Sequence, residues 1–222
     1  MSNRNIFKNS QGQGLKERRK VLAAWAQTKG LSLNDKASVV IASRYWRISC
    51  LQKGEGHFAS NVIEGILGTN KVCAFDYHYE MAKVDEDGNR KVTGHYYFSA
   101  VVVETDFKLK PLFIRKERFT DKIAESAGLN DIDFESTEFN NQFYVKAPDR
   151  KWAYDVVNQA TMELLMNHCQ FNIECNDKYI IAYRDELFEL GHFEEALQLL
   201  TGIIDNLPKT LFGKEKGEKL WS

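Results

Sequence analysis

The chain has 222 residues, of which 43% are hydrophobic and 27% are charged, and its formal net charge is −1 at pH 7. These values are typical of one globular domain with a sizeable core, and they exclude a largely disordered chain. The balanced charge argues against nucleic-acid binding through an overall basic field. No apolar segment reaches the roughly 18 residues of a membrane-spanning helix, and the N-terminus lacks the apolar segment of a secretion signal. We therefore expect a cytoplasmic protein.

The four cysteines lie in or near apolar segments and show no C-x-x-C spacing; they are Cys50, Cys73, Cys169 and Cys175. A buried thiol in such a segment behaves as a small hydrophobic side chain. Metal-binding and redox-active cysteines usually occur in closely spaced pairs. We therefore expect four structural thiols, and the sequence predicts no cofactor.

The N-terminal part begins with a polar stretch, residues 1–14, for which we expect a flexible leader. A helix is predicted from about Leu15 to Gly30, because Leu22, Ala23 and Ala26 share one face. Its first turns carry the basic cluster KERRK, residues 16–20. Such a cluster is either a solvated helix face or a contact site for acidic lipid or nucleic acid.

Residues 38–50 (SVVIASRYWRISC) fit either a helix through Ala42 or a strand that starts at Tyr45. An extended segment is expected from His57 to Leu67, near the breaks at Gly65 and Gly68.

A long aromatic β-hairpin is the clearest feature of the chain. Its arms are residues 71–81 (KVCAFDYHYEM) and 91–105 (KVTGHYYFSAVVVET), and Asp87, Gly88 and Asn89 suit the turn between them. In the first arm one set of alternate residues is apolar and the other becomes polar toward the turn. We expect the apolar set to pack against helices; it consists of Cys73, Phe75, Tyr77 and Tyr79.

The C-terminal half alternates short strands with helices. The predicted elements are a strand at 113–116, a helix at 120–127, an acidic loop at 131–138, a strand at 139–145, a helix from Asp149 to His168, a second hairpin at 171–183 that turns at Asn176 and Asp177, and a helix at 192–207 that Pro208 ends. Residues 211–222 are expected to form a frayed tail.

Together these elements predict a single α+β domain over residues 15–210. Its mostly antiparallel sheet is expected to be covered on one side by the helices 149–168 and 192–207, with the N-terminal helix at an edge.

The order of segments resembles an uncharacterised bacterial family of domains of unknown function, the DUF3137-like domains. The resemblance spans about residues 40–210 and rests on three segments, NVIEGILGTNKVCAFDYHYEM, KPLFIRKE and FESTEFNNQFYVKAPDRKWAYDVVNQATMELLM. Relatives are often soluble domains that follow a transmembrane anchor, which we expect this chain to lack. The resemblance supports the order of elements and implies no catalytic residue or substrate.

The polar face of the hairpin carries the candidate site. If the turn is centred on Asp87 and Gly88, the cross-strand pairs on this face are Glu80–His95, His78–Tyr97 and Asp76–Ser99. Two imidazoles and two carboxylates would then be close enough to bind Zn²⁺ or another divalent ion, or to support acid–base chemistry. The candidate metal ligands are Asp76, His78, Glu80 and His95. The alternative is a solvated polar face, and no H-E-x-x-H motif supports the metal site.

Two other candidates are weaker. Asp131 and Asp133 have the spacing of a calcium loop, but the glycine and the final glutamate of that loop are missing. The aromatic strands could stack on RNA, but no interleaved basic residues accompany them, so core packing is expected.

The sequence therefore predicts a non-catalytic intracellular binding or scaffolding module with an unknown protein or small-molecule partner and no nucleic-acid role. One alternative is a metal-dependent hydrolase that uses the polar hairpin face. The other is a peripheral membrane protein that uses the basic N-terminal helix.

Overall fold

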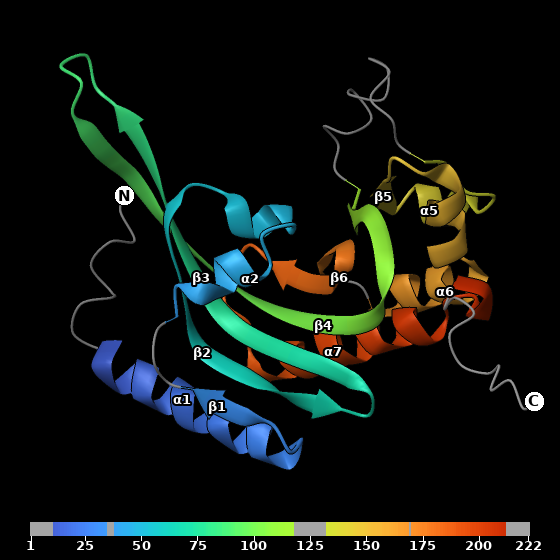
Figure 1. Cartoon of the computed structure of the whole chain (residues 1–222), viewed down its shortest axis with the longest axis horizontal. Coiled ribbons are helices and arrows are strands. Elements are labelled where there is room, and N and C mark those ends of the chain that lie inside the picture. Colours follow the sequence, from blue (N-terminus) through green and yellow to red (C-terminus); the bar gives the residue numbers. More distant parts are fainter. Residues whose placement is uncertain (1–10, 35–37, 118–131, 169, 212–222) are drawn as a thin grey trace, which may run out of the picture.

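The computed structural model describes residues 11–34, 38–117, 132–168 and 170–211, which form an α+β fold around one six-stranded sheet (Figure 1). All hydrogen-bonded neighbours in this sheet are antiparallel, which confirms the predicted α+β fold class. The strands are β1 (Ser32–Asn34), β2 (Glu55–Leu67), β3 (Asn70–Val84), β4 (Arg90–Lys116), β5 (Phe143–Lys146) and β6 (Asn172–Arg184). The helices are α1 (Gln11–Thr28), α2 (Val40–Arg44), α4 (Thr137–Asn140), α5 (Arg150–Val156), α6 (Gln159–His168) and α7 (Leu190–Asp205), with 3₁₀ turns η1 (Ser49–Gln52) and η2 (Lys209–Leu211).

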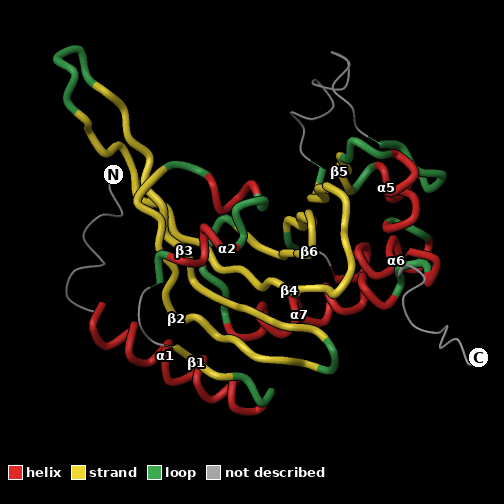
Figure 2. Tube along the Cα trace, viewed as in Figure 1, coloured by secondary structure: helices red, strands yellow, loops and turns green. Residues whose placement is uncertain are grey.

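Strand β4 is the longest strand, with 27 residues, and connects the two halves of the sheet. Its residues 90–104 pair with β3, and its residues 113–116 pair with β5. Strand β6 follows its other edge from Ser99 to Ile114, with register shifts between Glu104 and Leu112 where β4 curves (Figure 2). The short strand predicted at 113–116 is therefore the end of β4, and Pro111 lies in the irregular part of the pairing, where a residue without an N–H is tolerated.

Both faces of the sheet are covered, whereas the sequence analysis expected the helices 149–168 and 192–207 on one side and the N-terminal helix at an edge. Helices α1 and α7 lie on one side and α2 on the other (Figure 1). On the α1–α7 side, the β3 residues Val72 and Ala74 belong to the larger core. On the opposite side, Cys73, Phe75 and Tyr77 pack with side chains of the α2–η1 segment, which are Ile41, Tyr45, Ile48 and Leu51.

The burial of Cys73, Phe75 and Tyr77 was thus predicted correctly, but their expected contact with the C-terminal helices was wrong. Tyr79 is only partly buried. Around Val72 both alternate sets of β3 are apolar, so the alternation did not identify the face on which the helices pack.

The predicted helix 149–168 is interrupted between Val156 and Gln159. The helix starts at Asp149 as expected, and the structure shows that the Asp149 side chain caps α5, since its Oδ1 accepts from the Trp152 N–H at 3.0 Å. Asn158 then starts a new helix, because its Oδ1 accepts from the Thr161 N–H at 3.1 Å and its Nδ2 donates to the Asn206 carbonyl at 2.7 Å. The side chain of Asn158 therefore caps α6 and ties it to the end of α7.

Residues 171–183 do not form the predicted second hairpin, because residues 172–184 are the single strand β6. Asp177 has the positive φ (58°) of a turn residue, but it lies opposite Leu109 between two register shifts. Strand β4 pairs with β6 on both sides of Asp177. The positive φ of Asp177 therefore belongs to a register shift within one strand and does not reverse the chain.

Residues 38–50, which fitted a helix or a strand, contain α2 and the start of η1. Helix α1 begins at Gln11, before the expected start near Leu15. Several expectations lie outside the described residues: the leader over residues 1–10, the helix at 120–127, Asp131 in the acidic loop, Cys169 and the tail beyond residue 211.

Phe75 offers a test of the packing on the α2 side. Its side chain is fully buried, so Phe75→Ala should lower the free energy of unfolding by about 3–5 kcal/mol, as measured by urea denaturation. Val84 is 72% exposed, and Val84→Ala is the matched control, expected to change stability by less than about 0.5 kcal/mol. A loss below about 1 kcal/mol for Phe75→Ala would contradict this packing.

Candidate functional site

The predicted pairing of the hairpin is present in the structure. The direct cross-strand partners on the polar face are Asp76–Ser99, His78–Tyr97 and Glu80–His95. The register slips by one residue only between Met81 and Ala82, beyond these pairs. Since cross-strand partners share a face, all six side chains start from the same side of the sheet.

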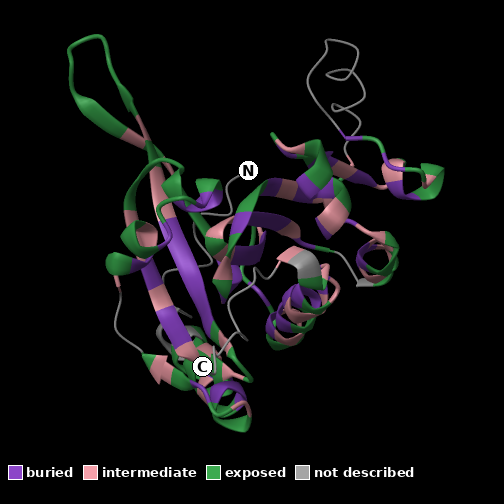
Figure 3. Ribbon diagram, turned by 45° about the vertical axis from the view of Figure 1, so that its right-hand side comes forward, coloured by how far each residue is buried: buried purple, intermediate pink, exposed green. Residues whose placement is uncertain are grey.

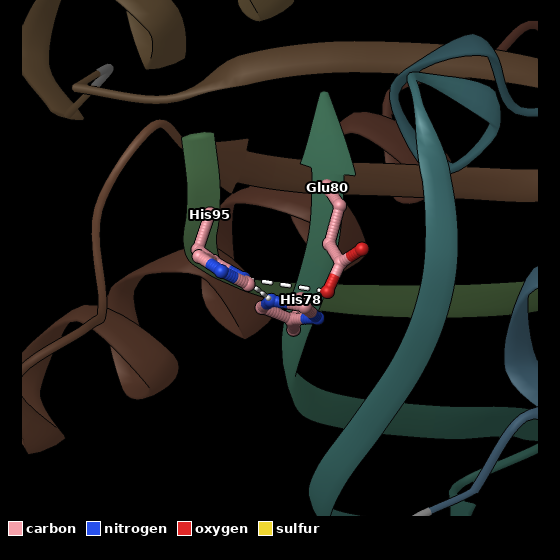
Figure 4. Close-up of side chains that lie close together, drawn as sticks. All are labelled: His78, Glu80 and His95. Carbon is pink, nitrogen blue, oxygen red and sulfur yellow. Dashed lines mark hydrogen bonds and ion pairs between the residues drawn. The ribbon is translucent and has the colours of Figure 1, made fainter. Parts of the chain in front are cut away.

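Three of the four candidate ligands come together (Figure 4). His78 Nε2 lies 3.1 Å from His95 Nδ1, and His95 Nδ1 lies 3.4 Å from Glu80 Oε1. One potential ligand atom from each residue lies within 4.8 Å of the other two. Among the residues that the structure describes, this is the one group of three or more His, Cys, Asp or Glu side chains with such spacing.

His78 is the buried member of this group, with 4% of its surface exposed. Its ring stacks on Phe58 with 4.5 Å between centroids, and the ring of Tyr97 lies 4.7 Å away. Its Nδ1 lies 3.3 Å from the Gly56 carbonyl oxygen. Burial lowers the pKa of His78 below its ordinary value, which favours the neutral imidazole with one free nitrogen lone pair.

Glu80 connects the group to the end of the hairpin. Its Oε2 accepts from Arg90 Nη2 at 3.0 Å, and Arg90 Nε also donates to Glu55 Oε1 at 3.0 Å. Gly56 has a φ of +64°, and a Cβ at this position would lie 3.2–3.3 Å from atoms of the Glu80 side chain. The Glu80 side chain therefore lies close to the Gly56 backbone, at a position where the positive φ and the tight contact both favour glycine.

Asp76 does not join the other three candidates. Its Oδ2 accepts from Arg18 Nε and from Asn61 Nδ2, both at 2.8 Å, and its Oδ1 accepts from Arg18 Nη2 at 2.7 Å and from the Ser99 hydroxyl. Both carboxylate oxygens of this buried residue are thus occupied by protein donors. Asp76 is part of a structural ion-pair network and is not available as a metal ligand.

The network around Asp76, which lies on β3, joins this strand to four other parts of the chain. Arg18 comes from α1, Asn61 from β2 and Ser99 from β4. Arg18 Nη1 also donates to the Phe188 carbonyl at 2.6 Å, and Ser99 Oγ accepts from the Phe188 N–H at 2.9 Å. The sequence analysis missed this role of Arg18. A usable signal was present, because Arg18 lies four residues before Leu22, which the sequence analysis had assigned to the apolar face of the helix, and residues four apart share a face.

The described cysteines support the expectation of structural thiols. Cys50, Cys73 and Cys175 are free and buried. Burial raises the pKa of Cys73 and of Cys175 to about 12, and it raises the pKa of Cys50 well above its ordinary value. The reactive thiolate form is therefore disfavoured at neutral pH.

In the part of the chain that the structure describes, no helix combines the length and the apolar character needed to span a membrane.

The comparisons with known proteins identify a fold and no family. Neither a model of a known protein family nor a curated protein matches the sequence. Among solved structures, the chain is similar to the crystal structure of the mycobacterial trehalose monomycolate transport factor A, TtfA, with a TM-score of 0.57. The alignment covers 88% of this chain and 97% of that chain at 12% identity, which shows a shared fold alone. The resemblance to DUF3137-like domains stays a prediction.

The Asp76 network can be tested by removing its acceptor. Asp76→Ala leaves the partly buried guanidinium of Arg18 without a counter-charge, so the free energy of unfolding should fall by about 3–5 kcal/mol. The exposed pair Glu17–Lys20 provides the control, and Glu17→Ala should cost at most about 1 kcal/mol. Combining Asp76→Ala with Arg18→Ala should cost clearly less than the sum of the two single variants. Additive losses would show that the two side chains do not interact.

Thiol labelling tests the burial of the cysteines. Iodoacetamide at pH 8 should leave Cys50, Cys73 and Cys175 unmodified in the folded protein, because their thiols are buried and protonated. All three should react after unfolding in guanidinium chloride, with each site followed by peptide mass spectrometry. Rapid modification of any of these three thiols in the folded state would contradict the structure.

Proposed function

We propose that this chain is a non-catalytic binding module that presents a projecting hairpin to a protein partner. The projecting part, residues 81–94, is called the ribbon. The observation that carries the proposal is that the ribbon extends past the rest of the sheet with little of its surface buried (Figure 3). The last β2 residue that pairs with β3 is Glu55, opposite Glu80, so in the described residues the ribbon consists of two strands only.

The exposed apolar side chains of the ribbon support a partner. A two-stranded hairpin without further packing is at most marginally stable in water. Val84 is 72% exposed and Met81 is 43% exposed. Tyr96 and Tyr97 expose their rings immediately next to the ribbon, and Tyr and Met are enriched at protein interfaces. A partner that buries these side chains would stabilise both itself and the ribbon.

The charges of the ribbon favour a protein over nucleic acid or a membrane surface. The turn is acidic, with Asp85, Glu86 and Asp87, whereas the arms carry Lys83, Arg90 and Lys91. Polyanions and anionic lipid surfaces select for basic patches of one sign. An acidic turn between basic arms instead suits a protein surface with complementary charges of both signs.

Two further points support a non-catalytic role. A solved structure with a similar fold is described as a transport factor. The basic cluster at the start of α1, which suggested membrane binding, has Arg18 directed to Asp76 and Lys20 within 3.6 Å of Glu17. Fewer of its charges are free than the sequence suggested. We propose that the chain binds this partner in the cytoplasm, the compartment expected from the sequence.

Site-specific photocrosslinking in the native host tests this proposal. A benzoylphenylalanine introduced at Val84 should give a crosslinked product of one defined mass, because the probe replaces an exposed side chain of the ribbon. Mass spectrometry would identify the partner, and the purified partner should bind the unmodified chain. The same probe at Glu195, an exposed position of α7, is the control and should give no such product.

The thermal midpoint of both probe variants should equal that of the unmodified protein, since neither position is buried. The proposal is overturned by products that are identical at the two positions, or by a partner that binds equally well after residues 83–91 are replaced with Asn-Gly.

A further inference from the structure

We propose that His78, Glu80 and His95 bind one divalent transition-metal ion, and that Zn²⁺ is the ion that fits best. The site lies at the base of the ribbon, with two ligands on β3 and one on β4. It is independent of the proposed partner, because it requires only residues of this chain.

The distances between the ligand atoms fit a tetrahedral ion. With Zn–N and Zn–O distances of about 2.0–2.1 Å, two ligands of a tetrahedral zinc lie about 3.3 Å apart. Two edges of the group measure 3.1 Å, from His78 Nε2 to His95 Nδ1, and 3.4 Å, from His95 Nδ1 to Glu80 Oε1. The third edge is below 4.8 Å, so small side-chain rotations suffice to close the triangle on one ion.

The surroundings of His78 prepare its Nε2 for a metal. Its Nδ1 lies 3.3 Å from the Gly56 carbonyl oxygen, which can only accept a hydrogen bond. With the proton on Nδ1, the lone pair of Nε2 points toward His95. A carbonyl that holds the second imidazole nitrogen in this way is the usual support of a metal-binding histidine. Stacking on Phe58 restricts the rotation of the ring.

Glu80 is held in place in a similar way. Arg90 binds its Oε2, which leaves Oε1 directed to His95 as a single-oxygen ligand. The positive φ and the missing side chain of Gly56 provide the space in which the carboxylate lies. Each of these two ligands on β3 thus has a second contact that fixes its orientation.

The ligand types indicate the class of ion. Two imidazoles and one carboxylate suit Zn²⁺ and its neighbours Co²⁺ and Ni²⁺, whereas Mg²⁺ and Ca²⁺ prefer oxygen ligands throughout. Three protein ligands leave the fourth tetrahedral position to water. Because the ligands come from both arms, the ion would crosslink β3 and β4 where the ribbon leaves the sheet.

Metal titration of the full chain tests the site. After removal of bound metal with a chelator, calorimetry with ZnCl₂ should show one saturable site. The thermal midpoint should rise by roughly 5–10 °C when free Zn²⁺ exceeds the dissociation constant about 100-fold. CoCl₂ should give the intense visible absorption of a tetrahedral site, which ZnCl₂ should then remove.

His95→Ala is the decisive variant, because this exposed side chain can be removed without disturbing the core. It should weaken Zn²⁺ binding at least about 10- to 100-fold and abolish the cobalt spectrum. His57→Ala is the matched control, because His57 lies on the other face of β2, beside Tyr77, and should leave binding unchanged. Absence of saturable ZnCl₂ binding, or equal affinity in His95→Ala and the unmodified chain, overturns the proposal. Neither result affects the crosslinking expected at Val84.

Discussion

The buried carboxylate of Asp76 is the constraint on which the arrangement of the elements depends. A carboxylate removed from water must be neutralised and hydrogen-bonded, and its donors here come from α1, β2 and β4. The guanidinium of Arg18, which neutralises it, also binds the Phe188 carbonyl just before α7. One buried charge therefore ties α1 to the sheet and to the segment where the chain enters α7.

Strand β4 connects this packed region to the rest of the fold. Because it pairs with β3, β5 and β6, its curvature sets the direction of both halves of the sheet. The sheet is buried on both faces around Phe75 and Ala74, and this burial ends toward Glu80 and His95. Beyond Glu80, β2 no longer pairs with β3. Apolar side chains of the hairpin such as Val84 are therefore exposed.

Asp76, His78 and Glu80 start from one face of one strand, yet their surroundings differ. Asp76 forms an ion pair with Arg18 and has a structural role. His78 is buried, and one of its ring nitrogens faces His95. Glu80 lies at the boundary with the ribbon and binds Arg90. A metal ion at this boundary would brace the ribbon at its base, so the proposed metal site and the proposed contact surface are neighbours without depending on each other.

The sequence by itself determined the hairpin, the pairing of Glu80 with His95, the helix start at Asp149 and the final helix, because alternation, turn residues and helix-start signals act over a few neighbouring residues. Only the tertiary structure decided which face of β3 packs on α1 and α7 and that residues 172–184 continue as one strand. It also decided that Asp76 pairs with Arg18, 58 positions away. These features depend on contacts between distant segments, and a local pattern carries no information about which distant partner will cover an apolar face or neutralise a buried charge.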